Sequence, residues 1–219
     1  MKVSKTSMEL YAVTDRSWLK AGETLAQKVK EAAEGGITFL QLREKELETA
    51  ALIQEGRTLK AIADFYGIPF VINDSVEAAL ACGADGVHVG QSDMAVEQAR
   101  KLLGPEKIIG ASVQTVEQAL LAQSSGADYL GVGAVFATST KRDAKALDWN
   151  VLREICQAVE IPVVAIGGIT ASNLLQLQGS GIDGIAVVSA IFAQPSIKEA
   201  VQLLREKTRL LLAGERSHG

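Results

Sequence analysis

The sequence predicts a single α/β domain folded as a (β/α)8 barrel, the TIM barrel, and three observations carry this prediction. A five-residue phrase recurs along the chain, eight short apolar runs alternate with helical segments, and 219 residues suffice for one barrel near its minimal size. Such an alternation indicates a parallel sheet covered on its outside. An open doubly wound sheet is the alternative, but Thr14–Trp18, after the first strand, lacks that fold's glycine-rich fingerprint.

The recurring phrase marks the passage from a helix into a strand. Its copies are Gly83–Val87, Gly126–Leu130 and Gly181–Ile185, with a weaker one at Gly35–Phe39. The glycine can take the left-handed conformation that ends a helix, and a β-branched run then enters a buried strand. A second phrase, Ile-Pro, opens two further strands at Ile68 and Ile161, since proline is tolerated at a strand's first position.

These signals place every element. The expected strands are 9–14, 37–43, 69–73, 85–89, 107–112, 128–133, 162–167 and 184–188. Helices fill the gaps, and the last runs from about Ser196 to Leu212. One side of that helix has the stripe expected of a helix lying on a sheet: Ile197, Val201, Leu204, Thr208 and Leu211. We expect one domain over 1–219, with loose termini at 1–7 and 214–219.

Composition excludes several classes of protein. With 47% hydrophobic and 22% charged residues the chain is a folded globule, and its net charge of −4 and 5% aromatic content argue against a nucleic-acid-coating protein. No apolar run approaches the roughly 18–20 residues of a membrane span, and no secretory signal is visible, so we expect a cytoplasmic protein. Cys82 and Cys156 are too few for a disulfide framework, and two histidines make zinc chemistry improbable.

The end of the second strand carries an alternating set of polar donors. With a period of two, Gln41, Arg43 and Lys45 share a face with Phe39, while Leu42 faces the other way. Ligands of such a barrel bind at the carboxyl ends of the strands. Because buried donors are costly unless paired, this set indicates an anion clamp, with an internal ion pair to a nearby carboxylate as the alternative.

Two carboxylates follow the next two strands. Asp74 comes directly after Asn73 at the end of the third strand, and Asp93 follows the fourth. Adjacent parallel strands lie about 4.8 Å apart, so the two side chains can converge on one Mg²⁺, which also keeps waters and substrate oxygens. Either aspartate alone would more simply cap a helix or turn. His88, inside the fourth strand, is expected to be a hydrogen-bonded barrel residue.

The remaining strand ends predict phosphate binding. Ser112 brings a hydroxyl to the rim, and the long polar loop 136–143 offers a cradle made of Thr138, Ser139, Thr140 and Lys141. Gly168 lets backbone N–H groups approach an anion, and Ser189 can begin a short helix that points its N-terminus inward. Two anion-handling regions with Mg²⁺ suit a pyrophosphate, and no nucleophilic triad or acid–base pair is apparent. We therefore expect a reaction driven by stabilising a departing anion.

Five motifs in order resemble the thiamine phosphate synthase family: Gln41–Lys45, Ile72–Asp74, Gly90–Asp93, Thr138–Lys141 and Ile166–Ile169. The resemblance runs from Leu10 to Ser189. It implies a TIM barrel and a Mg²⁺-dependent transferase that condenses 4-amino-2-methyl-5-(diphosphooxymethyl)pyrimidine with 4-methyl-5-(2-phosphooxyethyl)thiazole. Pyrophosphate leaves the pyrimidine's CH₂ group, the thiazole nitrogen bonds to that carbon, and thiamine phosphate results.

The resemblance also implies roles for individual residues. Asp74 and Asp93 would bind Mg²⁺, and Arg43, Lys45 and Lys141 would be catalytic. The pyrimidine diphosphate would contact Gln41, Arg43, Lys45, Asn73, Ser112 and Lys141. The thiazole phosphate would contact Thr138, Ser139, Thr140, Gly168, Val188 and Ser189. The chain departs from the family pattern at Ala137 and Ser139, where members often carry Thr or Pro.

Three alternatives remain at this point. A thiazole tautomerase of the same family group would need a phosphate cradle and a proton-transfer residue but no Mg²⁺–pyrophosphate site. A non-catalytic sensor of thiamine phosphates would bind without turnover. Another barrel enzyme for phosphorylated metabolites, such as a tryptophan-pathway isomerase, would need acid and base residues that the strand ends lack. The expected partners are two phosphorylated heterocycles, with no nucleic acid or membrane, and the sequence leaves a homo-oligomer open.

Overall fold

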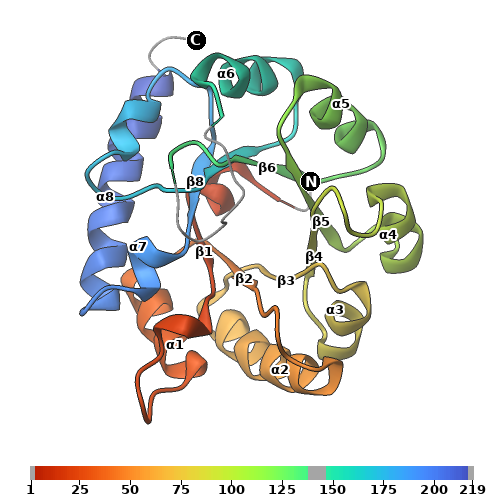
Figure 1. The fold of residues 1–219 in the computed structure, drawn as a ribbon, viewed down its shortest axis with the longest axis vertical. Helices are drawn as coiled ribbons and strands as arrows, with labels where there is room; N and C mark the ends of the chain where they lie inside the picture. The colour runs from red at the N-terminus through yellow and green to blue at the C-terminus, as the bar shows by residue number, and fades with distance from the viewer. Residues whose placement is uncertain (1–2, 138–146, 217–219) are drawn as a thin grey trace.

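Eight parallel strands close into a barrel in the computed structural model, which describes residues 3–137 and 147–216 (Figure 1). Each strand pairs with the next along the chain, and the eighth pairs with the first. The strands are β1 Leu10–Val13, β2 Phe39–Leu42, β3 Phe70–Asn73, β4 Gly86–Val89, β5 Ile108–Val113, β6 Tyr129–Gly133, β7 Val163–Ile166 and β8 Gly184–Val187. The predicted fold class is confirmed, and every expected strand is present.

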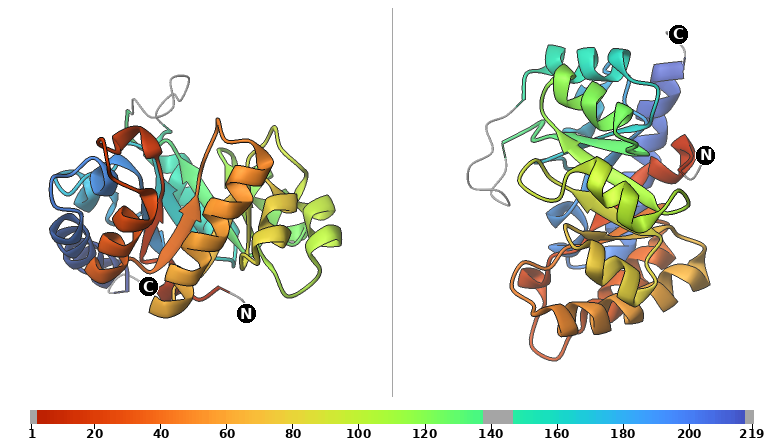
Figure 2. Two further views of the ribbon diagram at one scale, coloured as in Figure 1. Left: turned by 90° about the horizontal axis from the view of Figure 1, so that it is seen from below. Right: turned by 90° about the vertical axis from the view of Figure 1, so that its right-hand side faces the viewer.

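The helices surround the barrel (Figures 1 and 2). The α-helices are α1 Leu25–Gly35, α2 Thr49–Tyr66, α3 Val76–Cys82, α4 Val96–Leu103, α5 Val116–Ser124, α6 Trp149–Ala158, α7 Ser189–Phe192 and α8 Ile197–Arg216. Three 3-10 helices join them: η1 Lys5–Met8, η2 Arg16–Trp18 and η3 Leu174–Leu177. All five residues of the predicted stripe on α8 are buried. No helix in the described ranges has the length and apolar character needed to cross a bilayer.

Two local predictions differ from the structure. Between β7 and β8 the expected helix is only the four-residue η3, because the segment that follows contains Gly179 and Gly181, whose φ angles of 87° and 85° cannot continue a helix. At the amino end, part of the segment expected to be loose is structured, since η1 begins at Lys5 and Val3 is 1% exposed. At the other end α8 continues to Arg216.

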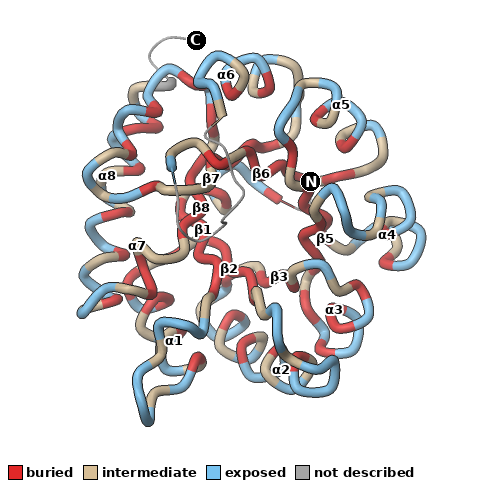
Figure 3. Tube along the Cα trace, viewed as in Figure 1, coloured by how far each residue is buried: buried red, intermediate tan, exposed pale blue. Residues whose placement is uncertain are grey.

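The barrel separates two apolar cores. The larger core lies between the strands and the surrounding helices, and the smaller one fills the barrel's interior. Figure 3 shows the strands as a buried ring, with exposure mainly on the outer faces of the helices and in the loops between elements. Tyr11, Phe39 and Tyr129 pack edge to face inside the ring, with centroid separations of 4.6, 5.8 and 5.4 Å. The interior is therefore filled with packed side chains.

The aspartate of the recurring phrase fixes the amino ends of the strands. In the three full copies, Gly83–Val87, Gly126–Leu130 and Gly181–Ile185, it accepts a hydrogen bond from a backbone N–H at the start of the preceding strand. Asp85 accepts from Phe70 at 2.8 Å and Asp128 accepts from Ile109 at 2.8 Å. Asp183 does the same for β7. These N–H groups would otherwise be left unpaired at the barrel's floor, so the repeat is structural and lies away from the ligand-binding end.

Candidate active site

One cavity of about 460 Å³ opens at the carboxyl ends of the strands, and residues from all eight strands or the loops after them line it. Every predicted site residue in the described ranges lines this cavity: Gln41, Arg43, Lys45, Asn73, Asp74, Asp93, Ser112, Gly168, Val188 and Ser189. Thr138, Ser139, Thr140 and Lys141 lie outside the described residues. The topology thus brings together side chains from positions 41 to 189, as the barrel prediction requires.

The cationic wall of the cavity comes from the end of β2. Gln41 is 4% exposed and lines the cavity, while its neighbour Leu42 packs in the outer core, as the period of two predicts. The backbone N–H of Arg43 donates to Thr14 Oγ1 at 2.9 Å, which fixes the chain where it leaves the strand. Arg43 and Lys45 form no ion pair with any carboxylate of the described residues. Both cations are therefore available to an anionic ligand.

Glu44, between these two cations, points away from them. Its Oε2 accepts from Arg16 Nε at 2.7 Å, and Arg16 also donates to Glu55 at 3.1 Å. Burial raises the pKa of Glu44, against the opposing effect of Arg16. The acidic residue of this motif thus anchors the β2 loop to η2 and leaves the cations to the cavity.

The carboxylate pair forms the wall beside the cations. Burial, together with the neighbouring Asp93 carboxylate, raises the pKa of Asp74 to about 6. Asp74 is the only non-glycine of the described residues with a positive φ, at 63°, and its backbone N–H donates to His88 O at 2.8 Å. The capping alternative does not hold for Asp74, because Ser75 caps α3 instead. It holds in part for Asp93, whose Oδ2 accepts from Gly90 N at 2.7 Å.

This pair fits a divalent cation. The Asp93 carboxylate lies close enough to Asp74 to add to the rise in the pKa of Asp74. Two negative charges at that range are stabilised by a cation between them. The described residues contain no cluster of three or more His, Cys, Asp or Glu side chains suited to a metal. Mg²⁺ is commonly held by one or two carboxylates with waters and substrate oxygens, so two ligands are enough for it.

The opposite wall lies at the ends of β7 and β8. Gly167 and Gly168 have φ angles of 100° and 67°, and α7 begins at Ser189 as predicted. A side chain on Gly168 would lie 2.8 Å from Phe136 Cβ, so this glycine also lets the segment after β6 pack closely. Asn173 Nδ2 donates to Gly168 O at 2.9 Å and holds the turn.

Sequence reasoning missed the residues beneath the cavity. Tyr11 and Tyr129 are fully buried and hydrogen-bonded to each other at 2.8 Å. His88 is a hydrogen-bonded barrel residue, as predicted, with Nδ1 2.9 Å from Tyr129 Oη and Nε2 2.9 Å from Ser112 Oγ. The available signal was a polar aromatic residue at an inward position of an otherwise aliphatic strand.

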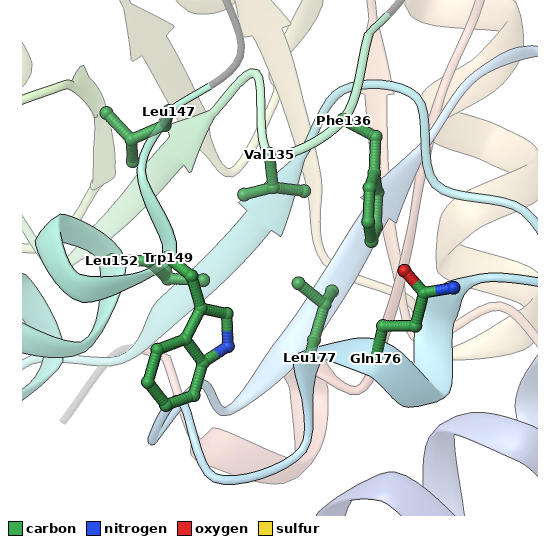
Figure 4. A pocket seen from close by; sticks show the side chains of 7 residues that line it. All are labelled: Val135, Phe136, Leu147, Trp149, Leu152, Gln176 and Leu177. Atoms are coloured by element: carbon green, nitrogen blue, oxygen red, sulfur yellow. The ribbon is translucent and has the colours of Figure 1, made fainter.

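A second, smaller cavity lies outside the barrel. Its volume is about 220 Å³, and Figure 4 shows its lining. The wall is mostly apolar and consists of Val135, Phe136, Leu147, Trp149, Leu152, Gln176 and Leu177. None of the described residues that line it is charged, whereas the first cavity is lined by Arg43, Lys45, Asp74 and Asp93.

Comparison with known proteins agrees with this geometry. The family model described as thiamine monophosphate synthase matches residues 10–191. The chain belongs to the thiamine monophosphate synthase family. The family resemblance stated from the motifs is thereby confirmed, and the chain is an enzyme of the transferase class.

Individual members of the thiamine monophosphate synthase family match over almost the full length. The thiamine-phosphate synthase of Ruminiclostridium cellulolyticum is 50% identical over 203 residues, covering 93% of this chain and 96% of that protein. The Clostridium tetani protein of the same name is 47% identical, covering 89% and 93%. The structure of thiamine phosphate pyrophosphorylase from Pyrococcus furiosus superposes with a TM-score of 0.87 at 40% identity, covering 95% of this chain and 98% of that one.

Proposed function

We propose that the chain joins an aminopyrimidine diphosphate to a thiazole phosphate and releases pyrophosphate, giving thiamine phosphate. The observation that carries the proposal is one cavity, in a chain of this family, that combines two paired carboxylates with two cations that form no ion pair among the described residues. The bond between the pyrimidine's CH₂ carbon and the diphosphate oxygen breaks, and its electrons leave with pyrophosphate. The lone pair of the thiazole nitrogen then forms the new C–N bond at that carbon.

The residues of the chain bind and orient the two substrates. Arg43 and Lys45 neutralise the charge that develops on the departing pyrophosphate, which is the electrostatic part of the catalysis. Gln41, Asn73 and Ser112 hold the pyrimidine diphosphate. Alignment of the two rings also lowers the barrier, because substrates that are already held in place lose no further translational freedom on the way to the transition state.

The thiazole phosphate is assigned to the wall across the cavity. Gly168, Val188 and Ser189 bind its phosphate there. The predicted roles of Thr138, Ser139, Thr140 and Lys141 complete the assignment and fall outside the described residues. Two features support this assignment. Gly167 and Gly168 have positive φ angles, so no side chain covers the backbone there, and α7 begins at Ser189.

Asp74 and Asp93 would hold a Mg²⁺ ion in this reaction. When bound, the ion supplies positive charge to diphosphate oxygens. The two aspartates bind it, and Asn73, which donates a hydrogen bond to Asp74, keeps that carboxylate oriented. The metal dependence is part of this proposal.

The same cavity argues against the tautomerase alternative. That reaction needs a phosphate cradle and a proton-transfer residue but no Mg²⁺–pyrophosphate site, whereas this cavity combines two cations with two paired carboxylates. The testing experiment is a turnover assay with both phosphorylated heterocycles, in the presence of Mg²⁺ and after chelation. Formation of thiamine phosphate and pyrophosphate in equal amounts, lost on chelation, is the expected result. Turnover that survives chelation would refute the metal's role, and proton exchange on the thiazole phosphate alone would favour the tautomerase.

A further inference from the structure

A continuous chain of hydrogen bonds crosses the barrel at the floor of the cavity, and four of its five side chains line the cavity: Tyr11, Gln41, His88 and Ser112. Gln41 Nε2 on β2 donates to Tyr11 Oη, which is 2.8 Å from Tyr129 Oη. Tyr129 Oη is 2.9 Å from His88 Nδ1, and His88 Nε2 is 2.9 Å from Ser112 Oγ on β5. We call these five side chains the relay. Its two ends, Gln41 and Ser112, both line the cavity.

The fold makes room for the relay. A Cβ on Gly110 would lie 2.5 Å from His88 Nδ1 and would also collide with the Tyr129 hydroxyl. A Cβ on Gly131 would lie 3.2 Å from His88 Cε1. Two strands therefore carry glycine where the imidazole and the phenol meet. Burial raises the pKa of Tyr11 and of Tyr129, so both hydroxyls keep their protons.

The direction of each hydrogen bond follows from the number of protons available. A hydroxyl has one proton, and a neutral imidazole has one N–H. Because Gln41 donates to Tyr11, Tyr11 must donate to Tyr129, and Tyr129 must donate to Nδ1 of His88. His88 then carries its proton on Nε2 and donates it to Ser112. With Gln41 donating, any other order leaves a buried hydroxyl proton without an acceptor among the described residues, which is unfavourable.

The reverse order would require the Gln41 amide to turn over. Its NH₂ group would then point away from Tyr11 in a cavity that Arg43 and Lys45 also line. An amide oxygen is the favourable dipole end to present to two cations, and an NH₂ group is the unfavourable one. The electrostatics of the wall thus select the direction in which Gln41 donates inward.

We propose that Tyr11, Tyr129 and His88 are positioning residues that present Gln41 to the ligand as a hydrogen-bond acceptor and Ser112 as a donor. None of the three needs to touch the reacting atoms. The inference rests on the proposed function for the ligand, an aminopyrimidine diphosphate. Such a ligand matches both ends, because its amino group donates and its ring nitrogens and phosphate oxygens accept. Fixing both ends in advance removes the cost of reorienting them on binding.

The first experiment reads the tautomer of His88 directly, without substrate. The chain has two histidines, so ¹⁵N-histidine labelling gives two sets of ring signals, and a His218→Gln variant assigns them. We expect an unprotonated Nδ1 and a protonated Nε2 at His88 in the parent protein at mildly alkaline pH. A protonated Nδ1 in the parent protein would overturn the proposal.

A variant that reverses the relay sharpens this test. In Gln41→Glu an ionised carboxylate can only accept, so Tyr11 must donate to it and the order inverts down to His88. We expect the proton to move to Nδ1, three hydrogen bonds away from the substitution. Gln202→Glu, at an exposed position of α8, introduces the same charge and should leave the signals unchanged. Unchanged ring signals of His88 in Gln41→Glu would show that residue 41 does not set the tautomer of His88, which contradicts the proposal.

The second experiment measures the consequence for the reaction. Tyr129→Phe keeps the ring packing but removes the donor to His88, and we expect KM for the pyrimidine diphosphate to rise about tenfold. KM for the thiazole phosphate should not change, and Tyr66→Phe, whose hydroxyl lies in an exposed contact with Glu34, should match the parent. An equal rise in both KM values, or none, contradicts a positioning role. If the parent protein does not turn over these substrates, the proposed function is wrong. The ¹⁵N signals of His88 still test the direction of the hydrogen bonds in the relay, because they need no substrate.

Discussion

Replacing Asp93 with asparagine separates the charge of the carboxylate pair from the local structure that it supports. One oxygen of Asp93 accepts from Gly90 N at 2.7 Å, and an asparagine oxygen can accept the same bond. The turn after β4 should therefore survive in Asp93→Asn, whereas alanine would remove the charge and the turn together. What asparagine cannot supply is the second negative charge beside Asp74.

The expected loss is large in rate and small in stability. If the pair holds Mg²⁺ against a departing pyrophosphate, loss of one ligand removes a charge stabiliser of the transition state, which costs about 10²–10³ in kcat. Retention of the Gly90 hydrogen bond limits the change in unfolding free energy to about 1 kcal/mol. The thiazole phosphate should bind as before, because its assigned wall at Gly168 and Ser189 follows β7 and β8, away from Asp93 after β4.

The assay is turnover with both substrates, accompanied by calorimetric titration of the thiazole phosphate. Asp64→Asn is the matched control, because Asp64 lies on α2 in an exposed pair with Lys60. We expect that control to keep the parent's kcat. Unchanged turnover in Asp93→Asn, or an equal loss of thiazole phosphate affinity, would refute the assignment of the pair to the pyrophosphate.

Two further predictions concern the barrel itself. Asp85→Ala leaves the N–H of Phe70 without its acceptor at 2.8 Å, and urea denaturation should show a loss of about 1–3 kcal/mol with the active cavity intact. Burial raises the pKa of Tyr11, so above about pH 10 the unfolded chain loses this proton first and stability falls by about 1.4 kcal/mol per pH unit. In Tyr11→Phe, urea denaturation at several pH values above about 10 should show a smaller fall of the unfolding free energy per pH unit. An identical fall in parent and variant would contradict this prediction.

The rim of the site was predictable because it depends on local periodicity and on one topological rule. Alternation along β2 placed Gln41 in the cavity and Leu42 in the outer core. The rule that parallel strands end on one side then gathered residues from distant segments. The helix after the third strand was likewise expected to open at Ser75, and Ser75 caps α3, but the left-handed backbone of Asp74 could not be predicted from the local sequence. In the recurring phrase, the sequence predicted that the glycine ends a helix, but it did not predict that the aspartate accepts a hydrogen bond from the preceding strand.

The relay could not have been predicted in this way, because it depends on contacts across the barrel. Tyr11 and Tyr129 lie 118 positions apart and meet through the interior, not through neighbouring strands. Their meeting with His88 requires the register that sets Gly110 beside both His88 and Tyr129. A glycine inside a strand reads as a weak point in the sequence, since it weakens the strand that carries it. In this barrel the missing side chain of Gly110 leaves the space in which the Tyr129 hydroxyl and the His88 imidazole form a hydrogen bond. The proposed orientation of Gln41 and Ser112 therefore depends on a glycine that the sequence alone does not single out.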